Sequence, residues 1–281
     1  MVYKVIILLI IGLCIIYALP LISWSRIPRL SISRSLMYTP LTLYRTSNSR
    51  IVSQKLYHNC YQKWINLNPN LSIEWFDERD RLRFMRTQGK VLLETYEALK
   101  PGAFKADLFR LCILYQRGGV YVDAETMPYV SLREMLKGVD LPVENRFISA
   151  LDAKESGGGI HNGFIISSPR HPFLKAAIDR IVTNVRRRSY EDHCLAITGP
   201  VCLARAINSY LGRDESTSFS LGINGNDDHT LFLFEFKWGP SQHIYKDKLC
   251  ILTKKHCLLS YLMSKMNPMA YSRMYKQHKV Y

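Results

Sequence analysis

Apolar residues recur at helical spacing in one long segment of the chain, and a short apolar run follows it. Residues 103–117 contain no proline or glycine, and their large apolar side chains recur every three or four positions, which predicts a helix. The glycine pair at 118–119 ends this helix, because helices commonly end at a residue with a left-handed backbone. The β-branched and aromatic residues 120–122 then predict a short buried strand. Two acids, Asp123 and Glu125, stand where this strand ends.

The same alternation of strand-like and helix-like stretches continues along the chain. Short β-branched or aromatic runs predict strands at 41–44, 71–76, 146–151, 164–167, 230–236 and 243–253. Helical periodicity predicts helices at 51–66, 91–99, 132–137, 172–187 and 200–211. The polar stretch 222–229 predicts a loop. Strands that alternate with helices indicate an α/β fold whose sheet is covered by helices on both faces.

Asp123 and Glu125 fall at the end of a strand, where ligands bind in sheets of this kind. Because side chains two residues apart point the same way in a strand, the two carboxylates can converge. Converging carboxylates suit a hard divalent cation such as Mg²⁺ or Mn²⁺, which also binds phosphate oxygens. The alternative is that both acids are solvated loop residues, and their spacing alone leaves this open.

A second charged pair, Asp107 and Arg110, lies three residues apart on the predicted helix and therefore shares one face. The carboxylate can accept hydrogen bonds from sugar or ribose hydroxyls, and the planar guanidinium can donate to phosphate or sugar oxygens. Together with a bound cation, these groups would suit a nucleoside diphosphate sugar. An ordinary surface salt bridge has the same spacing, so this alternative also stays open.

Several blocks of the chain resemble one known family. The blocks are KADLFR (105–110), GGVYVD (118–123) with Glu125, PLTLYRT (40–46), CYQKW (60–64), LNP (67–69), WFD (75–77), NGF (162–164), HPF (171–173) and TGP (198–200). Taken in the order of the chain, they resemble the glycosyltransferase sugar-binding region containing DXD motif, which is glycosyltransferase family 32. The family includes the fungal initiating α-1,6-mannosyltransferase and α-1,4-galactosyltransferase relatives. The resemblance extends over roughly residues 38 to 261.

The resemblance implies a glycosyltransferase domain of the GT-A type at 38–281, with a mixed, mainly parallel sheet flanked by helices. It implies a metal-dependent, retaining enzyme that takes a UDP- or GDP-linked sugar as donor. The acceptor would be a hydroxyl group of a glycan, a lipid-linked molecule or a protein. The implied cofactor is Mn²⁺ or Mg²⁺.

The resemblance also implies roles for individual residues. The implied catalytic residues are Asp107, Arg110 and Asp123. The implied substrate-binding residues are Tyr44, Arg45, Asp107, Arg110, Asn162 and Thr198. The implied metal ligands are Asp123, Glu125 and His256. Tyr44 and Arg45 would line the pocket of the nucleotide base, and Asn162 would face the donor sugar or the acceptor. Tyr44, Arg45, Asn162 and His256 each also have an ordinary structural interpretation, which the sequence leaves open.

One acid departs from the family pattern, because the family usually has Asp at both positions and this chain has Glu125 at the second. Glutamate is one methylene longer, which puts metal preference and turnover in doubt. An alternative function is therefore a catalytically weak or inactive relative that binds nucleotides or glycans. A phosphodiesterase or nuclease is a more distant alternative, because such sites usually gather more carboxylates and histidines around two metals.

The N-terminal residues form a long apolar stretch. Residues 5–19 are uninterrupted apolar apart from Tyr17, and the run extends to residue 22, which is just long enough to span a bilayer. No small-residue cleavage site follows, so an uncleaved signal-anchor at 1–22 is favoured over a signal peptide. A Ser/Arg-rich linker follows at 23–37. The flanking charges favour a cytoplasmic domain, whereas the resemblance implies a single-pass type II protein of the Golgi or ER.

The charge of the chain limits the classes of partner. The formal net charge is +15 at pH 7, which suits a phosphate-bearing ligand or an anionic membrane. No nucleic-acid partner is expected, because the basic residues are scattered and do not interleave with aromatic residues on a recognisable nucleic-acid fold. The local cluster Lys254–Lys255 is interpreted as solvated surface.

Overall fold

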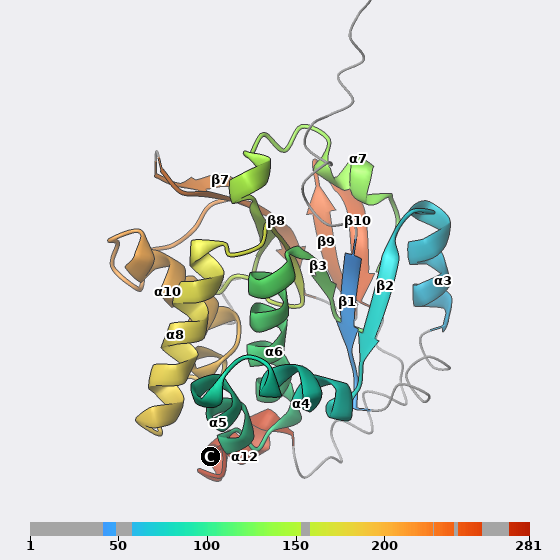
Figure 1. Ribbon diagram of the computed structural model, residues 1–281. Helices are drawn as coiled ribbons and strands as arrows, with labels where there is room; N and C mark the ends of the chain where they lie inside the picture. The colour runs from blue at the N-terminus through green and yellow to red at the C-terminus, as the bar shows by residue number, and fades with distance from the viewer. Residues whose placement is uncertain (1–41, 49–57, 153–157, 227, 239–240, 255–269) are drawn as a thin grey trace, which may run out of the picture. The chain divides into compact units, whose positions relative to one another are not determined.

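A mixed β-sheet organises the part of the chain that the structure describes (Figure 1). The computed structural model describes residues 42–48, 58–152, 158–226, 228–238, 241–254 and 270–281. The ten strands of the sheet are β1 (Thr42–Thr46), β2 (Ser72–Phe76), β3 (Gly119–Val122), β4 (Thr126–Pro128), β5 (Phe147–Leu151), β6 (Phe164–Ser167), β7 (Gly222–Gly225), β8 (Thr230–Lys237), β9 (Gln242–Lys246) and β10 (Leu249–Lys254). Their order is β2-β1-β3-β6-β5-β8-β9-β10-β4, and β7 pairs with β8.

Helices connect and cover these strands. They are α3 (His58–Leu67), α4 (Glu78–Arg86), α5 (Lys90–Ala98), α6 (Gly102–Arg117), α7 (Leu132–Leu136), α8 (Pro172–Arg186), α9 (Cys194–Ile197), α10 (Pro200–Tyr210) and α12 (Tyr271–Lys276), with a 3₁₀ turn at Val143–Asn145. The predicted helices and the first strands of the chain agree with these bounds to within a few residues where the structure describes them. The predicted α/β fold with a mixed sheet is confirmed.

The expectation of a mainly parallel sheet is wrong. The parallel pairs are β1 with β2, β1 with β3, and β5 with β8. The other six strand pairs of the sheet are antiparallel. Short connections account for three of these six pairs, β7 with β8, β8 with β9, and β9 with β10, because a tight turn can join only antiparallel strands, whereas a parallel pair needs a long crossover.

Two further expectations fail in the same C-terminal region. The stretch 243–253, predicted as one strand, forms most of the β9–β10 hairpin. Its turn residues Asp247 and Lys248 have φ angles of 47° and 68°, the left-handed backbone that a tight two-residue hairpin turn requires. The predicted polar loop 222–229 contains strand β7, which pairs with the start of β8. Both errors arise because turn residues other than glycine give a weak sequence signal.

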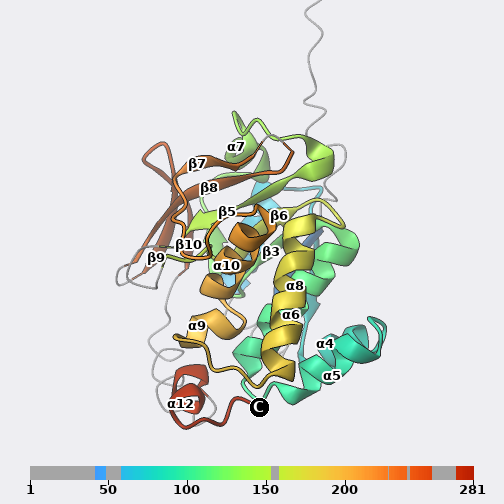
Figure 2. The ribbon, with the colours of Figure 1, turned by 90° about the vertical axis from the view of Figure 1, so that its left-hand side faces the viewer.

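Apolar side chains cover both faces of the central strands, as expected for helices on two sides. Tyr121 belongs to a core cluster that includes residues of α6, α8 and α10, and Figure 2 shows α8 and α10 in front of the strands. Val120 and Val122 belong to a second cluster with Trp64 of α3 and residues of α7. Successive residues of β3 therefore point to opposite faces, which is the alternation of a strand buried on both sides.

Helix α6 positions the strand that carries the acids. Its residues from Leu108 to Leu114 are all buried, which explains why its apolar residues surround the helix rather than form one stripe. The helix ends at Gly118, whose φ is 65°. A Cβ at this position would lie 2.7 Å from the Cδ atom of Pro169, so the turn into β3 requires glycine.

No helix of the described residues is both long enough and apolar enough to cross a membrane. The predicted anchor at 1–22 and the predicted linker at 23–37 lie outside the described residues.

Candidate active site

A cleft of about 450 Å³ opens where β3 ends, and it gathers most of the residues that the sequence singled out. Five predicted site residues line it: Asp107, Arg110, Asp123, Glu125 and Asn162. They come from α6, from the loop after β3 and from the turn before β6. The predicted convergence of the two charged pairs is therefore present in the structure.

Asp107 is a buried carboxylate with a partner on each oxygen. Its Oδ1 accepts a hydrogen bond of 2.9 Å from the side-chain amide of Asn162 and lies 3.2 Å from Nη2 of Arg110. Its Oδ2 accepts a hydrogen bond of 2.8 Å from the hydroxyl of Thr198. Thr198 does not line the cleft, but its hydroxyl fixes the carboxylate that does. These partners hold Asp107 in one orientation.

Arg110 connects Asp107 with the acid at the end of β3. Its Nη1 donates a 2.7 Å hydrogen bond to the backbone carbonyl of Asn162 and lies 3.4 Å from Oδ1 of Asp123. Its guanidinium also stacks over the ring of Tyr121, at 4.5 Å from the ring centre. A buried guanidinium that is fixed on two sides presents a rigid positive group to the cleft.

The two acids after β3 share one cationic partner. The Nζ of Lys254 lies 2.8 Å from Oδ2 of Asp123 and 3.1 Å from Oε1 of Glu125. The side chain of Lys254 is only 19% exposed, so its interpretation as solvated surface is wrong. Lys254 is the last residue of β10, and β10 pairs with β4. Strand β4 directly follows residues 123–125, which carry the two acids and are called the acid loop below. This pairing brings Lys254 to the acids.

Burial and charge shift the pKa values of these groups in different directions. Burial raises the pKa of Asp107 to about 6, although Arg110 and Thr198 oppose the shift. Burial would also raise the pKa of Asp123, but Lys254 and Arg110 outweigh it and hold this pKa well below its usual range. The pKa of Lys254 is raised above its usual range, because the two acids outweigh the effect of burial. Near neutral pH all these groups are therefore charged.

Arg45 fixes the backbone of the acid loop by hydrogen bonds. It is fully buried, and its Nη2 donates to the backbone carbonyls of Asp123 at 3.4 Å, of Thr126 at 3.3 Å, and of Ala124. Its guanidinium lies 4.9 Å from the ring centre of Trp75. Arg45 does not line the cleft; it fixes the backbone that carries the two acids.

The remaining predicted site residues lie elsewhere. Tyr44 is 2% exposed and packs in the core, with its ring 6.3 Å from the ring of Phe76. It does not line the cleft. His256 lies outside the described residues, so its predicted metal-binding role stays a prediction.

Sequence reasoning missed several residues of the cleft, of which Lys254, His161 and Trp238 carry the most chemistry. The ring of His161 stacks on Phe236 at 4.3 Å, and burial lowers its pKa to about 3, so it is neutral. Trp238 is 47% exposed, and its indole N–H donates to Asp152 at 2.8 Å. The available signal was weak, since His161 and Trp238 belong to no local pattern and Lys254 stands beside Lys255 in a cluster typical of solvated surface.

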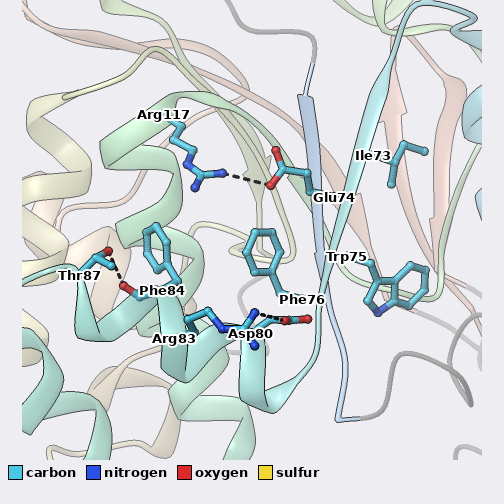
Figure 3. A pocket seen from close by; sticks show the side chains of 9 residues that line it. All are labelled: Ile73, Glu74, Trp75, Phe76, Asp80, Arg83, Phe84, Thr87 and Arg117. Atoms are coloured by element: carbon cyan, nitrogen blue, oxygen red, sulfur yellow. Dashed lines mark hydrogen bonds and ion pairs between the residues drawn. The ribbon is translucent and has the colours of Figure 1, made fainter.

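A second pocket of about 530 Å³ lies beside β2, between α4 and the end of α6 (Figure 3). Glu74 and Phe76 point to this side of β2, whereas Ile73 and Trp75 point to the other. Its main ion pair joins Arg117 and Glu74 at 3.1 Å, and both side chains are at least 40% exposed. Exposed ion pairs of this kind contribute little to stability and are ordinary features of a protein surface. The cleft beside the acids, with its buried charged groups, is therefore the stronger candidate for the active site.

The donor set of the cleft fits a divalent cation that is shared with a substrate. Within the described ranges, no group of three or more His, Cys, Asp or Glu side chains could hold a metal ion. Two carboxylates, Asp123 and Glu125, do converge on the single ammonium group of Lys254. Mg²⁺ is commonly held by one or two carboxylates together with waters and substrate phosphates, so two protein ligands are sufficient.

Comparison with known families identifies the segment that carries these residues. Residues 55–147 match the family model described as "Glycosyltransferase sugar-binding region containing DXD motif". This segment includes Asp107, Arg110, Asp123 and Glu125. The resemblance stated from the sequence is thereby confirmed. Glycosyltransferases with a DXD motif usually bind a divalent metal.

Individual relatives are distant. The uncharacterized glycosyltransferase L373 of Acanthamoeba polyphaga mimivirus is 27% identical over 74% of this chain and 73% of the viral protein. The mannosyl phosphorylinositol ceramide synthases CSH1 and SUR1 of Saccharomyces cerevisiae are 27% and 31% identical, over 53% and 42% of this chain. The chain spans only 37% and 28% of the length of these two yeast proteins.

Two solved structures resemble the fold at low sequence identity. The PaToxG glycosyltransferase is 16% identical, with a TM-score of 0.46, over 61% of this chain and 69% of that chain. The catalytic domain of alpha-toxin from Clostridium novyi is 12% identical, with a TM-score of 0.34, over 64% of each chain.

Proposed function

We propose that this chain, whose residues 55–147 match the glycosyltransferase sugar-binding region containing DXD motif, transfers a sugar from a nucleoside diphosphate sugar to an acceptor hydroxyl. The observation that carries this proposal is the buried network of Asp107, Arg110 and Asp123, which opens into a cleft beside Glu125. Carboxylates and a fixed guanidinium on one wall match the hydroxyls and the diphosphate of such a donor.

The proposed roles follow from the charges that develop during transfer. The anomeric C–O bond breaks, and negative charge grows on the departing diphosphate. Arg110, which is held rigid by Asn162 and Asp107, would stabilise that charge without having to reorganise. The carboxylates of Asp107 and Asp123 would accept hydrogen bonds from sugar and ribose hydroxyls and so fix the anomeric carbon for attack.

Asp123 and Glu125 would hold the metal, Mn²⁺ or Mg²⁺. When bound, the ion would supply positive charge to the diphosphate oxygens. We propose a retaining reaction, in which the acceptor hydroxyl attacks from the face that the diphosphate leaves and gives its proton to the departing diphosphate oxygen. The carboxylates of Asp107 and Asp123 are paired with cationic groups, so neither is an evident nucleophile.

The wider setting of the enzyme is also a proposal. A GT-A-type domain at 38–281 would be tethered by a signal-anchor at 1–22 as a single-pass type II protein of the Golgi or ER. Donors would be UDP- or GDP-linked, and acceptors would be glycans, lipid-linked molecules or proteins. The names of two yeast relatives specify a mannosyl group and a phosphorylinositol ceramide, so a mannose donor and a lipid acceptor belong in the first test panel.

A second candidate function is nucleotide or glycan binding without turnover. The observation that favours it is the ion pair of Lys254 with both acids, together with Glu125 in the place where the family has Asp. Such a protein would bind a nucleotide and release no product from any donor.

The test measures nucleotide release by the full chain from a panel of UDP- and GDP-sugars, with Mn²⁺, Mg²⁺ or a chelator. We expect release from one donor, lost with chelator and lost in Asp123→Ala. The control variant is Asp179→Ala, which removes an exposed acid of α8 and should leave the rate unchanged. Nucleotide binding without release would favour the second candidate, and a folded protein that binds neither a nucleotide nor a glycan would exclude both.

A further inference from the structure

Lys254 stands where a cation would have to lie to meet both acids of the DXD-like motif. Its Nζ is 2.8 Å from Oδ2 of Asp123 and 3.1 Å from Oε1 of Glu125. A divalent cation needs the same two oxygens at shorter distances, so the ammonium and the ion exclude each other by both volume and charge.

We infer that Lys254 is a resident counter-ion of this site, which a divalent cation must displace, and that the displaced ammonium group then binds the diphosphate of the donor. The inference rests on the proposed function, since it assigns the diphosphate as the new partner of Lys254. It goes beyond that function by making metal binding and nucleotide binding depend on each other.

The fold allows this movement of one side chain while the backbone stays fixed. Lys254 ends β10, where its backbone pairs with Thr126 of β4 on one side and with Gln242 of β9 on the other. Its long aliphatic stem is flexible, and the cleft beside it has room for a ligand. Arg110 differs, because its guanidinium is held by Asn162 and cannot leave the acids in the same way.

The charges in the site explain why the two ligands should bind together. Asp123, Glu125 and Lys254 together have a net charge of one negative unit. Binding of a divalent cation changes the net charge of the site to one positive unit. Binding of a diphosphate, with about two negative charges, makes it negative again. The cation alone therefore has to displace an ammonium group that finds no new partner, whereas in the presence of a diphosphate the ammonium gains one. Such mutual dependence is a coupling free energy between two ligands.

The experiment measures Mn²⁺ binding to the full chain by electron paramagnetic resonance, with and without UDP or GDP. In the unmodified protein we expect the nucleotide to tighten Mn²⁺ binding about tenfold, which is a typical coupling. In Lys254→Met, Mn²⁺ alone should bind about tenfold more tightly, because no ammonium competes for the acids. The nucleotide should then add little. Lys175→Met, which removes an exposed lysine that pairs with Asp179, should behave as the unmodified protein does.

Two further variants keep the outcome clear. Lys254→Gln replaces the methionine variant if that protein does not fold, as judged by near-ultraviolet circular dichroism. Lys254→Arg retains the charge, so Mn²⁺ alone should still bind weakly. Unchanged or weaker Mn²⁺ binding after loss of the charge would overturn the inference, as would full nucleotide coupling in Lys254→Met.

The same data separate this inference from the proposed function. If the unmodified protein binds no Mn²⁺ with or without nucleotide and Lys254→Met does, no cation displaces Lys254, and the inference is overturned together with the metal dependence of the proposed function. If Mn²⁺ and nucleotide bind as expected but no sugar is transferred, the inference holds and catalysis fails. If neither protein binds Mn²⁺, the inference itself is excluded.

Discussion

The two walls of the cleft are held in place in different ways. The acid wall consists of Asp107, Arg110 and Asp123, and its charged groups are fixed by buried partners, three of them on Asp107 alone. The hairpin wall consists of Trp238, which directly follows β8, and Lys254 of β10. Trp238 is 47% exposed, whereas the side chain of Lys254, at 19%, is about as buried as that of Asp123, at 21%. The indole of Trp238 donates a hydrogen bond to one carboxylate, that of Asp152, and the ammonium of Lys254 is held by the two acids that it faces.

This difference indicates that the two walls of the cleft have different roles. Groups that stabilise developing charge act best when they are oriented before the reaction begins, which describes the acid wall. Groups that exchange partners as ligands enter must be able to move, which describes the hairpin wall. We therefore expect substitutions in the acid wall to cost activity and stability, and those in the hairpin wall to change ligand binding at little cost in stability.

The largest expected effect is that of Arg110→Lys. Lysine keeps the positive charge but loses the planar group that bonds Asn162 and both acids at once. We expect kcat to fall by about 10³-fold, the loss typical for removal of a preorganised charge-stabilising donor. The control is Arg205→Lys, a partly exposed arginine that pairs with acids away from the cleft, and it should retain full activity. Similar rates for both variants would contradict the rigid acid wall.

A smaller loss is expected from Arg45→Met, although Arg45 does not line the cleft. The substitution removes the guanidinium that donates to the carbonyls of Asp123, Ala124 and Thr126 at once, so the acids shift. We expect activity to fall about 10²-fold, as for a displacement of about 1 Å in a catalytic group. The free energy of unfolding should fall by about 2 kcal/mol, which denaturant titration measures.

The control for this variant is Arg117→Met. Arg117 lies at the pocket of Figure 3, where it is 44% exposed and pairs with Glu74. Exposed pairs contribute at most about 1 kcal/mol, so this variant should keep its activity and nearly all of its stability. A fully active Arg45→Met would show that the acid loop holds its shape without the buried guanidinium.

The contrast between the walls also explains what the sequence could predict. In the acid wall, Asp107, Arg110 and Asp123 follow one another along a helix, a turn and a strand. Local periodicity and glycine positions are sufficient to bring such residues together. The sequence therefore predicted the helix, the strand and the two charged pairs that meet in the cleft.

The hairpin wall depends on contacts between distant parts of the chain. Lys254 lies 131 residues after Asp123, and their contact requires β10 to pair with β4. Strand β4 has three residues, and the β9–β10 turn has no glycine, so neither gave a clear local signal. The buried position of Arg45 has the same origin, since its contacts to the acid loop span 78 to 81 residues.

The pH dependence of transfer should report on the acid wall. The pKa of Asp107 is raised to about 6 by burial, whereas the pKa of Asp123 stays well below its usual range. Below pH 6 only Asp107 of this pair takes up a proton, and Arg110 loses one of its charged partners. We expect kcat/KM to be about tenfold lower at pH 5 than at pH 7, and this slope should disappear in Asp107→Asn.

The same group has an opposite effect on stability. The pKa of Asp107 is higher in the folded protein than the value of about 3.9 in an unfolded chain. Between about pH 4 and pH 6 the folded state therefore binds more protons, so the contribution of Asp107 to the free energy of unfolding falls as pH rises. Denaturant titrations of the unmodified protein and Asp107→Asn at pH 4 and pH 6 measure this difference. Equal pH dependence in both proteins would contradict a buried, titrating Asp107.

The smallest effects are expected for a matched pair of tryptophans. Trp64 is fully buried, and its indole donates to the carbonyl of Thr126 at 3.0 Å, directly behind the acid loop. Trp238 belongs to the hairpin wall, and its indole donates to Asp152 at 2.8 Å while the ring is 47% exposed. On replacement by phenylalanine, each tryptophan loses one indole hydrogen bond and a similar ring area. Any difference in stability between the two variants therefore reflects the surroundings of the ring.

Trp64→Phe should lower the free energy of unfolding by about 2 kcal/mol, because it removes one of the donors to the buried carbonyl of Thr126 and opens a small cavity. Trp238→Phe should lower it by less than about 1 kcal/mol, since water replaces the lost hydrogen bond at an exposed site. Its effect should instead appear as a few-fold rise in KM for one substrate. Equal losses of stability in the two variants would mean that the hairpin wall is as rigid as the acid wall, and the movement inferred for Lys254 would lose its structural basis.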